Sequence, residues 1–394
     1  MLAFTFPGQG SQRQGMGAAW TSHPSWELVE EASEEAGRDV GRLLLEADAT
    51  ELRATRNAQL TTFVLSLVVL DAVERVGLAP AMCAGHSLGE YSALTATGAL
   101  SFGDGVRVVK ARGEAMQDAA DDNPGTMAAV LGLDDDDADA ACRRADGDVW
   151  VANFNAPGQV VIAGAPEAVA AAGSVAKELG AKKVLPLPVG GAFHTPFMAP
   201  AREELRKGVA EATLRAPDVP VVANVDARPH TDPDEWTRLL SSQLTSPVRW
   251  RQTVQRMAED GVSMLVELGP GGVLTGMAKR SAPGVGTRAV ASPDDLDQLL
   301  EALAAEPASS GPGHEGEHLH VRERLVVSPA AGLFQPAGRW ERMPDDAGIE
   351  VGELIGTVGG VEVRSAFAGT VMGILAIAGE RITPSQPVIW LRAS

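Results

Sequence analysis

Residues 82–94 read MCAGHSLGEYSAL, and this short stretch decides the class of fold. An apolar run ends at Gly85, Ser87 stands two residues later, and Gly89 opens a segment with a helical pattern. A serine between two glycines, at the junction of a buried strand and a helix, is typical of a nucleophile elbow, where a tight turn exposes the hydroxyl near the helix N-terminus. Glycine and serine also favour ordinary turns, so a structural turn is the alternative interpretation.

The segments around this stretch alternate between strand and helix patterns, which predicts an α/β sheet. Residues 25–37 and 61–77 have helical patterns, and each ends at a glycine. The strand-like runs are MLAFTF at 1–6, VPVVANV at 219–225, SMLVEL at 263–268 and TRAVA at 287–291.

Residues 124–190 read as a separate small unit in the order strand, helix, hairpin, helix, strand. This order is that of a ferredoxin-like subdomain. The acidic run Asp134–Asp137 is interpreted as charge at a helix N-terminus rather than as a set of metal ligands.

The composition changes after residue 303. Residues 304–320, AAEPASSGPGHEGEHLH, are rich in Pro, Gly, Ser and His and predict a linker. Beyond it, VVSPAAGLF at 326–334 is echoed by VRSAFAGTV at 363–371. The repeat predicts a two-fold, all-β domain over residues 321–394, which resembles the biotinyl/lipoyl carrier fold.

The composition and net charge of the chain also argue against some classes of binding partner. The 394 residues carry a net charge of −19 and 4% aromatic residues, which argues against a nucleic-acid surface. The N-terminus lacks the pattern of a secretory signal, and we expect no membrane partner and a cytoplasmic protein. The two cysteines, Cys83 and Cys142, lie too far apart in sequence for a metal-ligand motif. Cys83 is expected to be a buried free thiol rather than part of a disulfide, a metal site or a nucleophile.

Five further segments accompany the elbow, in a fixed order along the chain. They are FPGQGSQ at 6–12, VKARGEAMQ at 109–117, GAFHTPFM at 191–198, QLTSPVRW at 243–250 and ELGPGGVLTGMAKR at 267–280. Over about residues 1–300 the chain resembles the malonyl-CoA:acyl carrier protein transacylases and the acyltransferase domains of polyketide and fatty-acid synthases. The resemblance implies an α/β-hydrolase-like acyltransferase core over 1–303, with the ferredoxin-like subdomain inserted.

The resemblance also implies a catalytic set. A serine hydroxyl is a poor nucleophile near neutral pH and needs a base within hydrogen-bond reach. In the family, the serine and histidine that match Ser87 and His194 supply nucleophile and base, and a backbone carbonyl near Gln243 orients the histidine. The backbone N–H groups that match Gln9 and Leu88 form the oxyanion hole.

Two further residues are expected to select the acyl group. The family's arginine that matches Arg112 forms a bidentate pair with the free carboxylate of malonyl, a geometry that suits a guanidinium. Phe193 resembles the malonyl-type signature, because its ring would fill the space that the α-methyl group of methylmalonyl needs.

The predicted reaction moves a malonyl group from malonyl-CoA through malonyl-Ser87 to the phosphopantetheine thiol of an acyl carrier protein, in fatty-acid or polyketide biosynthesis. We expect no metal and no bound cofactor. Lysine is absent after Lys279, and Gly359-Gly360 occupies the hairpin turn where carrier domains hold their modified lysine. Biotin and lipoate are therefore not expected. A structural role or docking to a synthase component is left for residues 321–394.

Alternatives stay open at this point. A serine hydrolase or thioesterase of the α/β-hydrolase type shares the elbow, transfer of a different acyl-CoA unit is compatible with the motifs, and a degenerate scaffold is the non-enzymatic alternative. CoA and carrier proteins are anionic, so this acidic chain needs a local basic patch to hold them. The candidates are Lys182, Lys183, Arg202, Arg206, Lys207, Lys279 and Arg280, and for each of them a solvated surface is the alternative interpretation.

Overall fold

The computed structural model describes residues 1–305, 323–342, 348–384 and 386–393. The chain divides into two compact units, Met1–Pro307 and Ala308–Ser394. The predicted linker, 304–320, lies outside the described residues except for 304 and 305. These two residues complete helix α13 (Pro293–Ala305), so the helix continues two residues into the segment predicted as linker.

The first unit is built on a six-stranded sheet with the strand order β10-β9-β1-β2-β7-β8. The strands are β1 (Leu2–Phe6), β2 (Met82–Gly85), β7 (Val221–Val222), β8 (Pro229–His230), β9 (Met264–Leu268) and β10 (Gly286–Val290). All neighbours are parallel except β8, which pairs antiparallel with β7. The mixed α/β class predicted from the sequence is confirmed.

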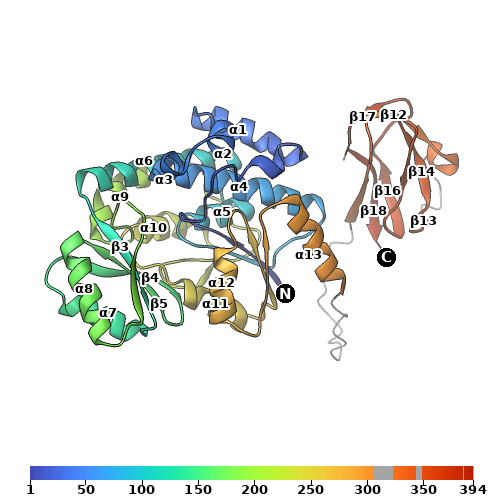
Figure 1. Cartoon of the computed structure of the whole chain (residues 1–394). Coiled ribbons are helices and arrows are strands. Elements are labelled where there is room, and N and C mark those ends of the chain that lie inside the picture. Colours follow the sequence, from blue (N-terminus) through green and yellow to red (C-terminus); the bar gives the residue numbers. More distant parts are fainter. Residues whose placement is uncertain (306–322, 343–347, 385, 394) are drawn as a thin grey trace. The chain divides into compact units, whose positions relative to one another are not determined.

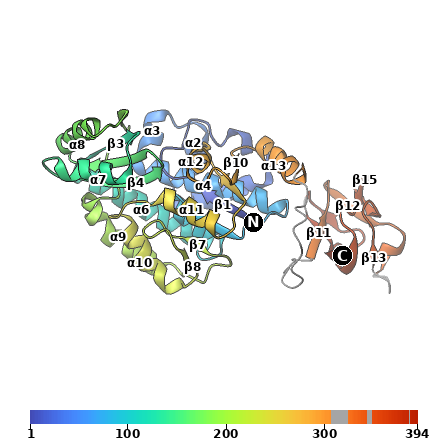
Figure 2. The same cartoon turned by 90° about the horizontal axis from the view of Figure 1, so that it is seen from below.

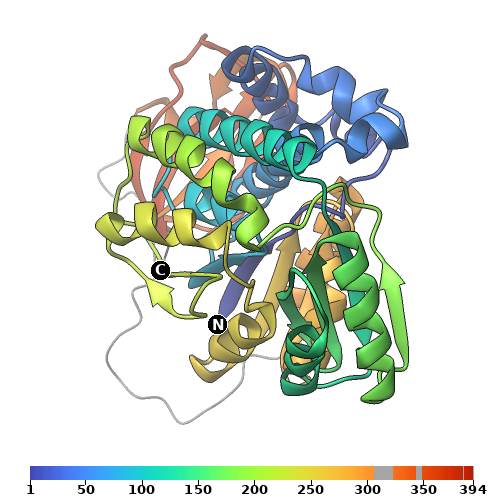
Figure 3. The same cartoon turned by 90° about the vertical axis from the view of Figure 1, so that its left-hand side faces the viewer.

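Helices cover both faces of this sheet (Figures 1 and 3). Of these, α4 (Thr55–Arg75), α5 (Gly89–Ala96), α12 (Val273–Ser281) and α13 pack directly on its strands. The other helices around this sheet are α1 (Glu27–Ala36), α2 (Val40–Leu45), α3 (Ala49–Arg53), α6 (Phe102–Asp122), α9 (Ala199–Glu211), α10 (Pro233–Gln243) and α11 (Trp250–Glu259). In β1, Phe4 and Phe6 join the larger core with α4, α5 and α6, whereas Ala3 joins a smaller core with α11 and α12. Burial on both faces explains the continuous apolar run of this strand.

Helix α4 is long and apolar enough to cross a membrane by length and composition, and it is the one such helix among the described residues. In the structure, 89% of the most apolar 18-residue stretch of this helix is buried inside the protein. Its residues Leu60, Phe63 and Val64 are completely buried in the larger core. The helix therefore has the surroundings of a core helix.

The segment predicted as a small unit forms a second, antiparallel sheet with the order β4-β5-β3-β6. Its elements are β3 (Thr126–Leu131), α7 (Asp135–Arg144), β4 (Val149–Ala156), β5 (Gln159–Gly164), α8 (Pro166–Glu178) and β6 (Lys183–Pro186). Helices α7 and α8 pack together against this sheet (Figure 2). The carboxylate of Asp134 accepts a hydrogen bond from the backbone N–H of Asp137, so the acidic run caps α7.

The second unit is rich in β-structure and contains two four-stranded sheets, β11-β18-β16-β13 and β15-β14-β12-β17. The strands are β11 (Glu323–Val327), β12 (Gly332–Pro336), β13 (Gly348–Ile349), β14 (Leu354–Val358), β15 (Val361–Arg364), β16 (Gly369–Ile374), β17 (Arg381–Ile382) and β18 (Pro387–Ala393). Phe334, Ile355, Ile382 and Leu391 are among the side chains of its separate core.

The two sheets are related by the sequence repeat. Exchanging β11 to β14 with β15 to β18, in order, converts the first strand order into the second. Matching turns make matching contacts: the Ser328 hydroxyl donates to the Ala330 carbonyl and the Ser365 hydroxyl to the Phe367 carbonyl, each at 2.7 Å. Each sheet therefore takes two strands from each half of the repeat.

Candidate active site

Ser87 lies on a tight turn between β2 and α5. Its φ is 52°, a left-handed conformation that side chains other than glycine rarely adopt. A Cβ added to Gly85 would lie 1.9 Å from the carbonyl carbon of Gly89, and one added to Gly89 would lie 2.0 Å from the Phe6 carbonyl oxygen. The turn thus requires glycine on both sides of Ser87, which is the physical basis of the Gly-x-Ser-x-Gly pattern.

The structure brings Ser87 and His194 together although 107 positions separate them. The Ser87 Oγ lies 2.8 Å from His194 Nε2, and His194 Nδ1 lies 2.8 Å from the backbone carbonyl oxygen of Gln243. A carbonyl oxygen only accepts, so the proton belongs on Nδ1 and Nε2 is left to accept from the serine. A backbone carbonyl orients this histidine, where a hydrolase triad would use an acid.

His194 is 4% exposed and also has a left-handed backbone, with φ of 62°. Burial lowers the pKa of His194 to about 3, the hydrogen bond to Gln243 opposes this shift, and the charge of Arg112 adds to it. The imidazole is therefore neutral near pH 7, which is the state a general base needs.

The two predicted oxyanion donors lie on different segments. Gln9 follows β1 in a loop held by hydrogen bonds from the Ser11 hydroxyl to the Gly8 carbonyl and from the Gly10 N–H to the Gln12 side chain, both 2.7 Å long. Leu88 immediately precedes α5. Neither the Gln9 nor the Leu88 backbone N–H donates to an acceptor in the described part of the chain, so both amides remain available for a ligand oxygen.

Arg112 lies on α6 and is only 1% exposed, unlike most helix arginines. Its Nη1 donates to Gln59 Oε1 at 2.6 Å, and its Nη2 donates to Gln243 Oε1 at 2.9 Å and to Ser87 Oγ at 3.1 Å. All three acceptors are uncharged. A buried guanidinium directed at the serine hydroxyl is a site for an anionic group next to the reacting atom.

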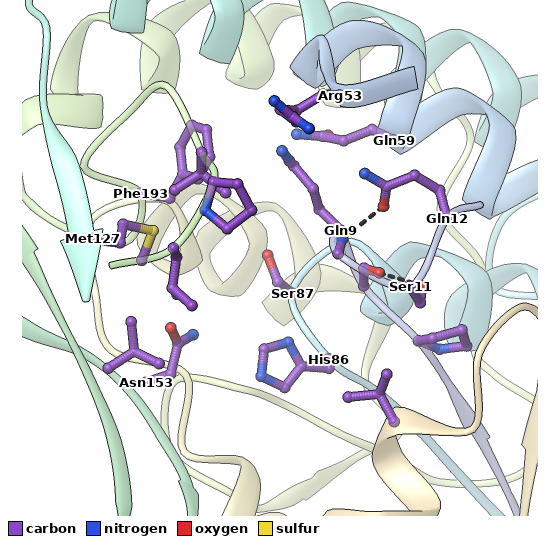
Figure 4. A pocket seen from close by; sticks show the side chains of 18 of the residues that line it. Gln9, Ser11, Gln12, Arg53, Gln59, His86, Ser87, Met127, Asn153 and Phe193 are labelled. Carbon is purple, nitrogen blue, oxygen red and sulfur yellow. Dashed lines mark hydrogen bonds between the residues drawn. The ribbon is translucent and has the colours of Figure 1, made fainter. Parts of the chain in front are cut away.

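Ser87, His194 and Arg112 line one cavity of about 470 Å³. Figure 4 shows Ser87 between Phe193 and Met127 on one side and Gln9 and Gln12 on the other. Phe193 is buried and lines the same cavity. The cavity therefore joins a serine hydroxyl, a neutral imidazole, a guanidinium and an apolar wall.

Basic residues at the cavity differ from those predicted. Arg13 and Arg53 line it, whereas none of the seven predicted basic residues does. Of those seven, Arg206 and Lys207 form exposed pairs with Glu203 and Glu204 on their own helix. Charges on one helix face pair with one another, as these two do, and the seven residues stay candidates for a basic patch outside the cavity lining. The sequence signal for Arg13 is GQGSQRQG, in which it stands four residues after Gln9.

The sequence analysis also missed the polar residues that surround the pair. Asn224 Oδ1 accepts from the Ser87 N–H at 2.7 Å, and Asn224 Nδ2 donates to the Gly85 carbonyl at 2.7 Å. Glu90, in the first turn of α5, accepts from the Asn224 N–H at 2.7 Å. The discernible signals were a polar residue ending an apolar strand in VVANV and an acid directly after the elbow.

His86, which directly precedes Ser87, lines the same cavity, and its Nε2 lies 2.9 Å from Asn155 Oδ1. Cys83 and Cys142 are buried free thiols, and burial raises the pKa of Cys142 to about 12. No group of three His, Cys, Asp or Glu side chains suited to a metal ion occurs among the residues with described positions.

Comparison with known proteins adds an independent line of evidence. The acyl transferase domain family matches residues 3–292. The malonyl CoA-acyl carrier protein transacylase of Escherichia coli K12 is 44% identical over 307 residues, which are 76% of this chain and 99% of that protein.

Solved structures give the same result. An acyl carrier protein S-malonyltransferase from Vibrio cholerae aligns with a TM-score of 0.73 and 42% identity over 76% of this chain and 99% of its own. A malonyl-transacylase in complex with a type II polyketide synthase acyl carrier protein, PlMCAT:AntF, aligns with a TM-score of 0.74 and 40% identity over 76% and 99%.

Proposed function

This chain belongs to the acyl transferase domain family, among the malonyl-CoA:acyl carrier protein transacylases, and from this premise we propose how its residues carry out malonyl transfer. It is an [acyl-carrier-protein] S-malonyltransferase that takes malonyl-CoA and an acyl carrier protein as partners. Its relatives serve fatty-acid and polyketide biosynthesis.

The first half of the reaction acylates Ser87. His194 Nε2 takes the Ser87 proton while Oγ attacks the thioester carbonyl of malonyl-CoA, and the N–H groups of Gln9 and Leu88 receive the developing oxyanion. The tetrahedral intermediate collapses with cleavage of the C–S bond. His194 returns its proton to the departing CoA sulfur, which leaves malonyl-Ser87 and CoA thiol.

The second half reverses these roles with another thiol. The phosphopantetheine thiol of the carrier protein gives its proton to His194 and attacks the serine ester. The C–O bond to Ser87 then breaks, His194 returns the proton to Oγ, and the malonyl thioester leaves on the carrier protein. The free enzyme is restored with no net change in protons.

One observation carries the assignment of malonyl as the acyl group, namely the 3.1 Å contact between Arg112 Nη2 and Ser87 Oγ. In a malonyl ester one methylene separates the carboxylate from the ester carbonyl on Oγ. A guanidinium beside Oγ is therefore placed to bind that carboxylate, and burial strengthens the pairing because water competes less. An acetyl group has no carboxylate to use this contact.

Intact-protein mass spectrometry tests the proposal. The chain incubated with malonyl-CoA should gain one malonyl group, the Ser87→Ala chain should gain none, and added holo carrier protein should remove the group as malonyl-carrier protein. Release as free malonate would favour the hydrolase alternative. An adduct that persists on Ser87→Ala would place the nucleophile elsewhere.

Phe193 is proposed to set the preference for malonyl over methylmalonyl, because its buried ring lines the cavity beside His194. One methyl group in an apolar pocket discriminates by about 1–3 kcal/mol, so Phe193→Ser should relax the preference by about 10- to 100-fold. Competition between the two CoA esters measures it. A preference of the unmodified chain for methylmalonyl-CoA would refute this role.

The finer fold assignments are also proposals. The ferredoxin-like assignment of 124–190 is supported by the strand order β4-β5-β3-β6 and by α7 and α8 packing against that sheet. The biotinyl/lipoyl-like assignment of 321–394 is supported by the two related sheets. We propose that this unit carries no biotin or lipoate, docks to a synthase component, and that the protein is cytoplasmic and needs no cofactor.

A further inference from the structure

Glu90 is a buried acid that the mechanism above does not use. It stands three residues after Ser87 and is 1% exposed. Its Oε1 accepts from the Asn224 N–H at 2.7 Å, and its Oε2 accepts a short hydrogen bond from Gln243 Nε2. A buried carboxylate is expensive unless hydrogen bonds hold it, so both partners matter for its placement.

The two partners of Glu90 hold the backbone of the nucleophile on both sides. Asn224 Oδ1 accepts from the Ser87 N–H at 2.7 Å, and Gln243 Nε2 donates to the Ser87 carbonyl at 2.9 Å. Ser87 itself has a left-handed backbone, with φ of 52°. Glu90 therefore positions the two side chains whose hydrogen bonds hold the Ser87 turn in its unfavourable conformation.

Gln243 also connects Glu90 to Arg112. Its side-chain carbonyl accepts from Arg112 Nη2 at 2.9 Å, and its NH₂ group donates to Glu90. The amide thus bridges the guanidinium of Arg112 and the carboxyl group of Glu90. Burial raises the pKa of Glu90 to about 7, and its hydrogen bonds from Asn224 and Gln243 and the charge of Arg112 oppose this rise. Within the described residues, no carboxylate contacts Arg112 directly. Burial lowers the pKa of Arg112, and the nearby Glu90 charge is among the effects that oppose this.

We propose that Glu90 is a positioning residue, which acts through the Gln243 amide to orient Arg112 and so sets the preference for acyl groups with a free carboxylate. This inference rests on the proposed malonyl transfer. It assigns Glu90 two tasks: one through Asn224 on the turn of Ser87, and one through Gln243 on the cation.

Glu90→Gln separates this role from simple packing, because the two side chains have nearly the same shape. The new amide can accept from the Asn224 N–H with its oxygen, but its NH₂ group then faces the NH₂ group of Gln243. Relief requires the Gln243 amide to turn over, which points a donor at Arg112 and removes the donor from the Ser87 carbonyl. Arg112 then loses one of its three acceptors, Gln243 Oε1, together with the remote carboxyl group of Glu90.

The experiment measures acylation of Ser87 by malonyl-CoA and by acetyl-CoA in single turnovers of the full chain. For Glu90→Gln, malonyl acylation should fall about 30-fold or more and acetyl acylation about fivefold or less, because only malonyl uses the charge-assisted contact with Arg112. Glu90→Asp keeps the charge and should recover part of the malonyl-to-acetyl ratio.

Glu267→Gln is the matched control. Glu267 is also 1% exposed, and its Oε2 accepts from the Thr275 N–H at 2.7 Å and from the Thr275 hydroxyl at 2.8 Å. Neither Glu267 nor Thr275 lines the cavity. The Glu267→Gln substitution should lower the unfolding temperature without changing the ratio of the malonyl to the acetyl acylation rate.

Equal losses for both acyl groups in Glu90→Gln would overturn the proposal and leave Glu90 a structural residue. If Glu90→Gln does not fold, Glu90→Asp decides: a fall of threefold or more in the ratio supports the proposal and an unchanged ratio overturns it. Failure of the proposed function is seen separately, because the unmodified chain would then not form malonyl-Ser87.

Discussion

Ser87 combines chemical function with backbone strain. Its φ of 52° disfavours a residue with a Cβ by about 1–2 kcal/mol, and its hydroxyl contacts both His194 and Arg112. Ser87→Ala and Ser87→Gly should both abolish acylation, but only glycine relieves the strain. We expect Ser87→Gly to exceed Ser87→Ala in stability by about 0.5–1 kcal/mol, after the entropy loss of glycine is included.

Denaturant unfolding of the two variants measures this difference. Equal stabilities, or a more stable alanine variant, would mean that contacts of the turn rather than its dihedral angle determine its stability.

His194 leads to a prediction about pH. Its pKa is about 3 in the folded chain against 6.5 for an exposed histidine, so between these values the unfolded chain binds a proton that the folded chain does not. Stability from this residue is therefore intact above about pH 6.5 and is lost as the pH falls toward 3, by at most about 1.4 kcal/mol per pH unit.

His194→Gln removes this ionisation. The difference in unfolding free energy between the unmodified chain and the variant should shift in favour of the variant as the pH falls from 7 to 4.5. Other groups, including Glu90, cancel in the difference. A difference independent of pH would show that His194 titrates alike in folded and unfolded chains.

Residue roles differ in how far the sequence can reveal them. Ser87 was predictable from the Gly-x-Ser-x-Gly pattern around it, whereas His194 was predictable only from the resemblance to the acyltransferase family. The burial of Arg112 was not, because one face of α6 meets partners from distant segments. Glu90 and Asn224 are 134 positions apart, and their contact exists only after β7 aligns beside β2.

At the scale of elements, the glycines of the elbow allow β1, β2 and α5 to approach one another closely. A methyl group on Gly89 would meet the Phe6 carbonyl, which belongs to a central strand and cannot move aside alone. Gly89→Ala should therefore destabilise the chain by about 3 kcal/mol and disturb acylation. Thermal unfolding and the malonyl adduct measure the two effects.

Gly276 is the control for this substitution. It lies in α12, exposed, with no atom within 4 Å of an added Cβ. Gly276→Ala should stabilise the chain by about 0.5–1 kcal/mol, because alanine favours the helix and restricts the unfolded chain. Similar effects of the two substitutions would contradict the steric explanation of the elbow.

Element types were easier to predict than element bounds. The pattern at 219–225 predicts a strand, but only Val221–Val222 belong to β7. The chain turns at Ala223, so that the Asn224 side chain accepts from the Ser87 N–H, and then returns as β8. The composition after 303 predicted a linker, yet α13 continues to Ala305. In both places the rest of the fold, rather than the local sequence pattern, determines where the element ends.

For the whole molecule, we expect the first unit to function alone. Its core clusters contain no residue of the second unit, as far as the chain is described. A chain ending at Pro307 should fold and keep its acylation rate within about twofold. Loss of solubility or of the malonyl adduct would show that the second unit is part of the catalytic body.

The exchange of strands between the two halves of the second unit bears on its chain connectivity. The hairpin between β14 and β15, with Gly359 and Gly360 at its turn, corresponds under the repeat to the pairing of β18 with β11, where Glu323 lies opposite Arg392. The first and last strands of the unit are therefore neighbours. A circular permutant of this unit could be opened at the Gly359–Gly360 bond and closed between residues 393 and 323. It would keep every strand pairing, and its new termini would lie at the hairpin turn where carrier domains hold their lysine.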